Sequence, residues 1–311
     1  SCHHAGDGAR ALIALRHAGF DIAKESLDET LAWLGRPAAW DAENGDSEFK
    51  DERLARLQFG VALLRAVESG VIENRAPLAE AARLLAGDQK ADGSWDGGST
   101  NAIGSPTAWS SRLATLFAID VLRAADATAH SESLRRADEW LRGALPRNVH
   151  EAAIALLRLA RETDDGAQAH VERAFEILRD GRHASGGWGP YATSAPQAFD
   201  TALVLLALAP YRRGTSPDGN EARDPVEAGS IDRAGAPRDA NDEDDANDEK
   251  RDGRPDPDEI ERWIRGGREL LRALQLDDGS WPETTRPSGG ESYAQRTSTT
   301  AWALLALLRV R

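Results

Sequence analysis

The chain has 311 residues, of which 29% are charged, and its formal net charge is −14. A surface of this sign repels a phosphate backbone, so a nucleic-acid partner is excluded. No run of about 18 apolar residues occurs, so we expect no transmembrane segment. Cys2 is the only cysteine, so no internal disulfide can form and the cellular compartment stays open.

Apolar residues recur at helical spacing along most of the chain and predict eleven helices. These cover residues 7–18, 26–35, 48–69, 77–88, 109–125, 131–143, 149–161, 167–180, 197–209, 259–274 and 299–310. Ser26 and Glu29 form a capping box for the second helix, and Asn148 caps the seventh. The odd-numbered helices are apolar on nearly all sides, whereas the even-numbered ones have one polar face. We therefore expect the odd-numbered helices to lie inside and the even-numbered ones outside.

The composition changes sharply between residues 213 and 258, which are rich in Asp, Glu, Gly, Pro, Asn and Arg. Such a segment cannot bury enough apolar surface to offset its chain entropy. We therefore predict a disordered acidic insertion at 213–258, within a single domain that covers residues 1–311.

A seven-residue phrase occurs three times, at residues 89–95, 182–188 and 275–281, each time between an amphipathic helix and an apolar one. The repeated positions are Gln89, Gly93 and Trp95, then Gly186 and Trp188, then Gln275, Gly279 and Trp281; the second copy has Arg182 in place of the Gln. The Gly permits a tight turn, and the Gln amide can bond free backbone groups at a helix end. A phrase repeated at helix junctions is typical of stacked helical hairpins, so we expect these residues to be structural.

The spacing of the copies supports one repeat unit. Trp95 and Trp188 are 93 residues apart and enclose two predicted hairpins, and the next interval of 93 encloses one hairpin plus the insertion. The junctions at 36–48 and 144–148 are then eroded copies of the phrase, with Trp40 as a remnant in the first.

The pattern Gln-x-x-x-Gly-x-Trp resembles the QW motif of squalene–hopene cyclases and oxidosqualene cyclases. Residues 297–307, Thr-Ser-Thr-Thr-Ala-Trp-Ala-Leu-Leu-Ala-Leu, are similar to the segment that follows a cyclase repeat. The chain thus resembles the squalene–hopene cyclase and prenyltransferase-like family. This resemblance implies an all-α fold, an α/α toroid of about six helical hairpins with inner and outer rings of helices. It also implies an apolar, isoprenoid-like ligand in the central cavity.

The catalytic motifs of that family are incomplete here. The cyclase proton donor is the middle Asp of Asp-x-Asp-Asp, and Asp200 matches only the last Asp of that motif. Phe199 stands at the donor position and cannot give a proton, and no Asp-x-Cys pair supports the zinc site of the prenyltransferases, so no metal is predicted. Whether the chain is an enzyme stays open; the alternative is a non-catalytic binding or scaffolding toroid with a protein partner.

Parallel inner helices bring their N-termini to one end of the cavity, which makes that end the default site. The catalytic candidates there are Asp200, His150 and Glu151. The candidates for the cavity mouth are His3, His4, Arg112 and Tyr293, with Ser110, Thr201 and Thr299 nearby. The alternative for each acidic residue is a helix cap or a first-turn charge. No cofactor is predicted, unless a Cys three positions before Cys2 completes a covalent haem sequence.

Overall fold

The computed structural model describes residues 4–40, 52–97, 103–160, 167–212, 254–284, 286 and 290–311. Within these residues the chain is all-α, with eleven α-helices, two short 3₁₀ helices and no strand. The helices are α1 (His4–His17), α2 (Lys24–Leu34), η1 (Pro37–Ala39), α3 (Glu52–Glu68), α4 (Ala76–Asp88), α5 (Ser111–Asp126), α6 (Ser131–Arg142), α7 (Val149–Leu159), α8 (Gln168–Asp180), α9 (Ala198–Leu208), η4 (Ala209–Tyr211), α10 (Pro257–Leu274) and α11 (Tyr293–Arg309).

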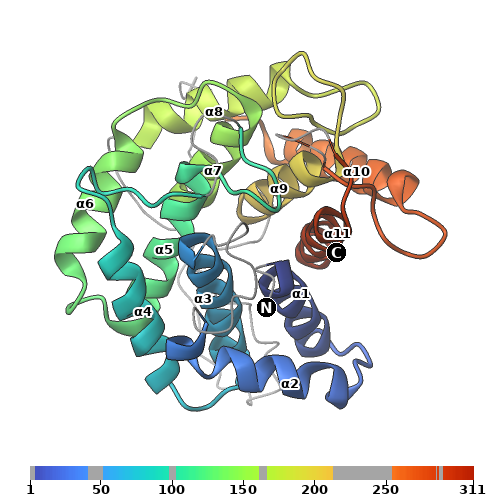
Figure 1. Cartoon of the computed structure of the whole chain (residues 1–311). Coiled ribbons are helices and arrows are strands. Elements are labelled where there is room, and N and C mark those ends of the chain that lie inside the picture. Colours follow the sequence, from blue (N-terminus) through green and yellow to red (C-terminus); the bar gives the residue numbers. More distant parts are fainter. Residues whose placement is uncertain are drawn as a thin grey trace, which may run out of the picture.

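The odd-numbered helices contact one another in a closed series. Helix α1 packs on α3, α3 on α5, α5 on α7, α7 on α9, α9 on α11, and α11 returns to α1. Figure 1 shows these helices around the middle of the view, with α2, α4, α6, α8 and α10 outside them. The even-numbered helices pack on odd-numbered neighbours, as α4 does on α3 and α5. The apolar, all-round sequence of a helix such as α9 fits this arrangement, because its neighbours bury it on nearly every side.

Several predicted helix starts differ from the structure by two residues or more, and two of them show why. Helix α2 begins at Lys24 with Ala23 as its N-cap, so Ser26 lies inside the first turn and does not cap it. Helix α11 begins at Tyr293, six residues before the predicted start, because the Ser292 side chain caps it by accepting from the Gln295 N–H at 3.2 Å. The first turns of α11 are rich in Ser and Thr, which have low helix propensity, so the sequence did not predict a helix there.

The cap at Asn148 is confirmed, since its Oδ1 accepts from the Glu151 N–H at 2.9 Å. Residues 213–253 of the predicted insertion lie outside the described residues. The chain is described again from Arg254, and Pro257 and Asp258 are the first residues of α10. The Asp256 carboxylate caps this helix, accepting from the Glu259 N–H at 2.7 Å.

The Trp of each repeated phrase is fully buried and joins two helices. The indole N–H donates at 2.7–2.8 Å to a carbonyl in the last turn of the preceding outer helix, namely Leu85, Leu178 or Leu271. The backbone N–H donates at 3.0–3.1 Å to a threonine Oγ1 of the following inner helix, namely Thr115, Thr201 or Thr300. Each indole therefore satisfies a free carbonyl at the end of the preceding helix rather than covering the next one.

The Gly of each phrase has a positive φ, at +92° for Gly93, +96° for Gly186 and +83° for Gly279. In the first two copies the next outer helix packs directly on it. A Cβ on Gly93 would lie 2.5 Å from the Arg136 carbonyl oxygen of α6, and one on Gly186 would lie 2.6 Å from Gly266 of α10. A Cβ on Gly279 would meet only the phrase's own Gln side chain, at 3.9 Å. Among the described residues, no following helix packs against the Gly of the third copy.

The Gln side chains follow the same pattern. Gln89 donates at 2.9 Å both to the Gly93 carbonyl of its own phrase and to the Ser133 carbonyl of α6. Gln275 donates at 2.9 Å to the Gly279 carbonyl. The amide thus closes the turn in the first and third copies, and in the first copy it also binds the next helix.

Trp40, the remnant in the first eroded junction, keeps part of this geometry. Its side chain is fully buried, and its indole N–H donates to the Trp33 carbonyl of α2 at 3.2 Å. The indole contact with the preceding helix is therefore the part of the phrase's geometry that Trp40 retains. Residues 41–48 of this junction lie outside the described part of the chain.

Candidate functional site

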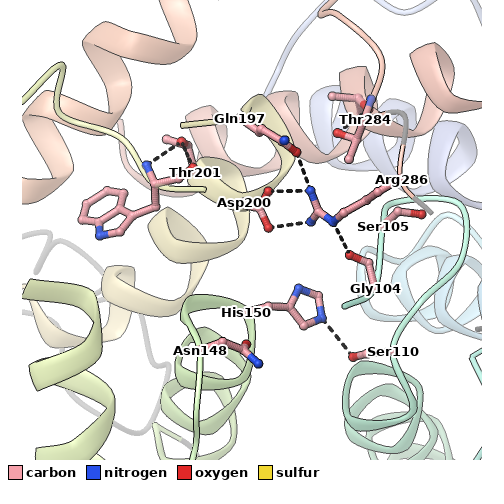
Figure 2. A network of polar contacts seen from close by, with 12 residues as sticks. Gly104, Ser105, Ser110, Asn148, His150, Gln197, Asp200, Thr201, Thr284 and Arg286 are labelled. Carbon is pink, nitrogen blue, oxygen red and sulfur yellow. Dashed lines mark hydrogen bonds and ion pairs between the residues drawn. The ribbon is translucent and has the colours of Figure 1, made fainter. Parts of the chain in front are cut away.

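The first turns of α5, α7 and α9 meet the segment that precedes α11, as Figure 2 shows. Ser110, the N-cap of α5, lies 2.9 Å from His150 Nε2 in the first turn of α7. The His150 ring lies 6.0 Å from the ring of Phe199 in the first turn of α9. The structure thus brings together the N-termini that carry Ser110, His150 and Asp200.

Asp200 forms a bidentate ion pair with Arg286, a residue that lies 86 positions further along the chain. Arg286 Nη2 donates to Oδ1 at 2.6 Å and Nη1 donates to Oδ2 at 2.9 Å. The same guanidinium donates to the Gln197 side-chain oxygen and, through Nε at 3.2 Å, to the Gly104 carbonyl. Arg286 therefore ties the start of α9 to the loop before α5 (Figure 2).

The ion pair decides the chemical state of Asp200. Burial raises the pKa of this carboxyl group, and the Arg286 guanidinium opposes that shift. Both carboxylate oxygens accept short, charge-assisted hydrogen bonds, which is the arrangement that most favours the ionised form. Burial outweighs the guanidinium, so the pKa of Asp200 stays above its ordinary value, but both carboxylate oxygens act as acceptors while the pair is formed.

His150 is the second titratable group of the site, and only 1% of it is exposed. Burial, together with the positive charge of Arg286, lowers its pKa to about 3, so the imidazole is neutral near pH 7. Its Nε2 bonds Ser110, and its Nδ1 has no hydrogen-bond partner. A neutral imidazole in this position links α5 to α7.

Glu151 lies at the start of α7 and takes part in a helix cap. Its carboxylate accepts from the Arg147 N–H at 2.9 Å and from Arg147 Nη2 at 3.1 Å. Its own backbone N–H donates to the capping side chain of Asn148. Burial would raise the pKa of Glu151, but the hydrogen bonds from Arg147 and the charge of Arg112 lower it below its usual range. Glu151 therefore stabilises the start of α7 from its first turn, the alternative that the sequence left open for this acid.

Three of the residues expected at the cavity mouth lie in the described part of the chain, and each has different surroundings. Arg112 lies 5.8 Å from the Trp140 ring of α6 and donates to the Ala144 carbonyl just after that helix at 3.2 Å, and its Nε is 3.9 Å from Glu151 Oε1. Tyr293, the first residue of α11, is 87% exposed. His4 is the first residue of α1 and is partly buried.

The other polar residues near this end are used within the fold. Thr201 accepts from the Trp188 N–H, and Thr299 Oγ1 accepts from the Thr284 N–H at 3.3 Å. Cys2 and His3 lie outside the described residues, so the haem hypothesis stays a prediction.

Aromatic side chains fill the space between α5, α9 and α11. This aromatic cluster consists of Trp109, Phe117, Phe199 and Trp302. The Trp302 ring lies 5.3 Å from Phe199, 6.0 Å from Phe117 and 6.3 Å from Trp109. Phe199 therefore packs as a core side chain.

The sequence did not reveal Arg286, because it stands in a Thr-Thr-Arg-Pro-Ser segment typical of a loop. The predicted site residues also do not include Asp7 and Arg10, which form a buried ion pair of 3.2 Å on α1. The sequence could have indicated this pair, because Asp7 and Arg10 are an acid and a base one turn apart on a helix that is apolar on nearly all sides.

Among the residues that the structure describes, no three His, Cys, Asp or Glu side chains are grouped to hold a metal ion. No helix in the described part of the chain has the length and apolarity that a membrane span requires. A scan of family models and a search of curated proteins find no match for this chain. The interpretation of the site therefore depends on its own geometry.

Proposed function

We propose that the chain is an α/α toroid of six helical hairpins and that it acts as a non-catalytic binding or scaffolding module. The closed series of contacts among the six odd-numbered helices supports an inner ring, and the five even-numbered helices outside it support an outer ring. The exposed turn at Gly279 supports a sixth hairpin whose outer helix is missing from the described residues.

One observation carries the non-catalytic assignment. Asp200 is the only residue that aligns with the cyclase acid motif, and both of its oxygens are bound by Arg286. A general acid must be protonated and must reach its substrate. A buried carboxylate in a bidentate ion pair meets neither condition, and Phe199 takes the donor position.

A turnover assay tests this proposal. The purified protein and its Asp200→Asn variant are incubated separately with squalene and with prenyl diphosphates, and products are identified by gas chromatography and mass spectrometry. We expect no product from either protein, with a known cyclase as the positive control. A product formed by the wild type and lost in Asp200→Asn would overturn the non-catalytic assignment.

The aromatic cluster favours a second candidate function, the binding of an isoprenoid-like ligand inside the ring. Aromatic rings offer large apolar contact areas, and Trp302 and Phe199 meet edge to face at 5.3 Å between α11 and α9. This candidate predicts that farnesol quenches tryptophan fluorescence and that Phe199→Ala changes the affinity. Equal quenching by an octanol control, or no change in Phe199→Ala, would contradict it.

A further inference from the structure

The three copies of the repeated phrase differ in what covers them. In the first copy α6 packs on Gly93, where a Cβ would lie 2.5 Å from the Arg136 carbonyl oxygen. In the second copy α10 packs on Gly186, where a Cβ would lie 2.6 Å from the Gly266 backbone. Each covering helix is the outer helix that comes after the next inner helix in the chain. A covering helix is therefore a regular part of the repeat.

The third copy has the same backbone without a covering helix. Gly279 has a φ of +83°, and a Cβ there would meet only the Gln275 side chain, at 3.9 Å. Gly279 is exposed, whereas Gly93 and Gly186 are buried. In Figure 1 no outer helix of the described residues lies between α10 and α2, outside α11 and α1. The place that α6 and α10 take in the other copies is therefore open in this part of the structure.

The Gln of the first copy shows which groups a covering helix supplies. Gln89 Nε2 donates to the Ser133 carbonyl at 2.9 Å, and its Oε1 accepts from the Arg136 side chain. Ser133 and Arg136 are one turn apart on α6, so one helix satisfies both ends of the amide. Among the described residues, Gln275 bonds only within its own phrase. Its amide can therefore take the same two contacts from another helix.

Apolar side chains near the third copy are incompletely covered. Leu276 is 37% exposed, and Tyr293, the first residue of α11, is 87% exposed. Arg296, one turn after Tyr293, donates to Glu283 at 2.8 Å, so the start of α11 lies beside the phrase. Further along α11 four leucines are half-buried, namely Leu304, Leu305, Leu307 and Leu308. A helix packed on α11, as α10 packs on α9, would bury apolar surface there.

The charges of the third copy favour a positive side chain on the covering helix. Asp277 and Asp278 give this phrase two negative charges and no positive one, whereas Lys90 balances the single acid of the first copy. Both acids are exposed. Arg296 reaches Asp278 at 3.9 Å, and Asp277 adds a further negative charge. Opposite charges across an interface orient a partner, so an arginine suits this position.

We propose that the third copy and the outer side of α11 form the docking site for an amphipathic, arginine-bearing α-helix of a partner protein. The apolar side of that helix packs on α11. One of its backbone carbonyls accepts from Gln275 Nε2, its arginine donates to Gln275 Oε1, and Gly279 lets its backbone approach closely. The inference rests on the toroid arrangement proposed above and not on the absence of catalysis.

Fluorescence anisotropy with a labelled peptide tests this proposal. The probe is residues 130–143 of this chain, the sequence of α6, with a hydrocarbon staple between positions 135 and 139, which are exposed in α6. The staple is needed because isolated helices shorter than about 15 residues are marginal in water. We expect saturable binding to the wild-type protein below about 1 mM peptide. Gln275→Ala, Gly279→Ala and an Arg136→Ala peptide should each weaken binding about tenfold.

Gly70→Ala is the matched control for Gly279→Ala. Gly70 follows α3, has a φ of +71° and has nothing within 4 Å of an added Cβ, so its substitution brings the same backbone strain at a distant place. Peptide binding should be unchanged in this variant, and circular dichroism checks that every variant is folded. Weaker binding in the third-copy variants alone places the peptide at Gly279 and supports the proposal.

Three results would overturn the proposal. They are no saturable binding up to about 1 mM peptide, equal binding by all protein variants, and a dimer of the protein alone that Gly279→Ala dissociates in sedimentation experiments. The last result would show that a second copy of this chain occupies the site. Turnover of squalene together with the expected peptide binding would refute only the non-catalytic assignment, so the two proposals can fail separately.

Discussion

Removing the guanidinium of Arg286 should strongly destabilise the fold. In Arg286→Gln, Asp200 loses two hydrogen bonds of 2.6 and 2.9 Å while its side chain remains fully buried. Breaking a buried ion pair from one side costs about 3–5 kcal/mol, because the remaining charge is left uncompensated. The Arg286 side chain is 19% exposed, so part of the ion pair is solvated and we expect the lower end, roughly 3 kcal/mol.

Urea unfolding followed by tryptophan fluorescence measures this loss, and a double-mutant cycle isolates the ion pair. Asp200→Asn alone should cost about 1–3 kcal/mol, and the double variant should be more stable than Arg286→Gln, because no charge is then left buried. The deficit of Arg286→Gln should shrink at low pH, since Asp200 can then take up a proton. Additive single effects, or a loss below about 1 kcal/mol as for an exposed pair, would refute the reasoning.

Four other variants probe the repeat and the start of the inner helices. Gly93→Ala should lower the free energy of unfolding by roughly 2–5 kcal/mol, since φ is +92° and the new Cβ would lie 2.5 Å from the Arg136 carbonyl oxygen. Gly279→Ala should lower it by only about 1–2 kcal/mol, because only its positive φ opposes the new side chain. Equal urea midpoints for the two variants would contradict this. Thr201→Val leaves a buried backbone N–H without its acceptor and should cost about 1–3 kcal/mol by the same measurement. The His150 pKa of about 3 means that its contribution to stability is complete above about pH 6.5 and is lost, at up to about 1.4 kcal/mol per pH unit, as the pH falls toward 3. His150→Gln should flatten that part of the pH profile, and an unchanged profile would show that the imidazole is not buried neutral.

The helices and their order could be predicted because the distribution of apolar and polar residues along each helix indicates whether it is buried or exposed. The all-round apolar sequence of α9 and the one polar face of α10 distinguish inside from outside. The repeated Gly and Trp positions marked three of the junctions, because a positive φ and a buried indole occur together where the chain turns from α4 to α5, from α8 to α9 and from α10 to α11.

The site could not be predicted to the same depth, because its decisive contacts join distant residues. Nothing near Arg286 in the sequence shows that it reaches Asp200, so the sequence predicted Asp200 as a catalytic candidate, with a first-turn charge as the alternative. Arg112 and Tyr293 lie near the starts of inner helices, but helix rotation turns Arg112 toward α6 and leaves Tyr293 exposed. Sequence spacing fixes the level of a residue along a helix more firmly than the direction of its side chain.

The ionisation state of the Asp200 carboxyl group at pH 7 tests the account most directly. The ¹³C resonance of its Cγ, assigned by its disappearance in Asp200→Asn, distinguishes a carboxylate from a carboxylic acid. We predict a carboxylate at pH 7 in the wild type, held by Arg286, and a shift toward the protonated form in Arg286→Gln. A protonated Asp200 at pH 7 in the wild type would contradict the account, because that is the state a proton donor requires.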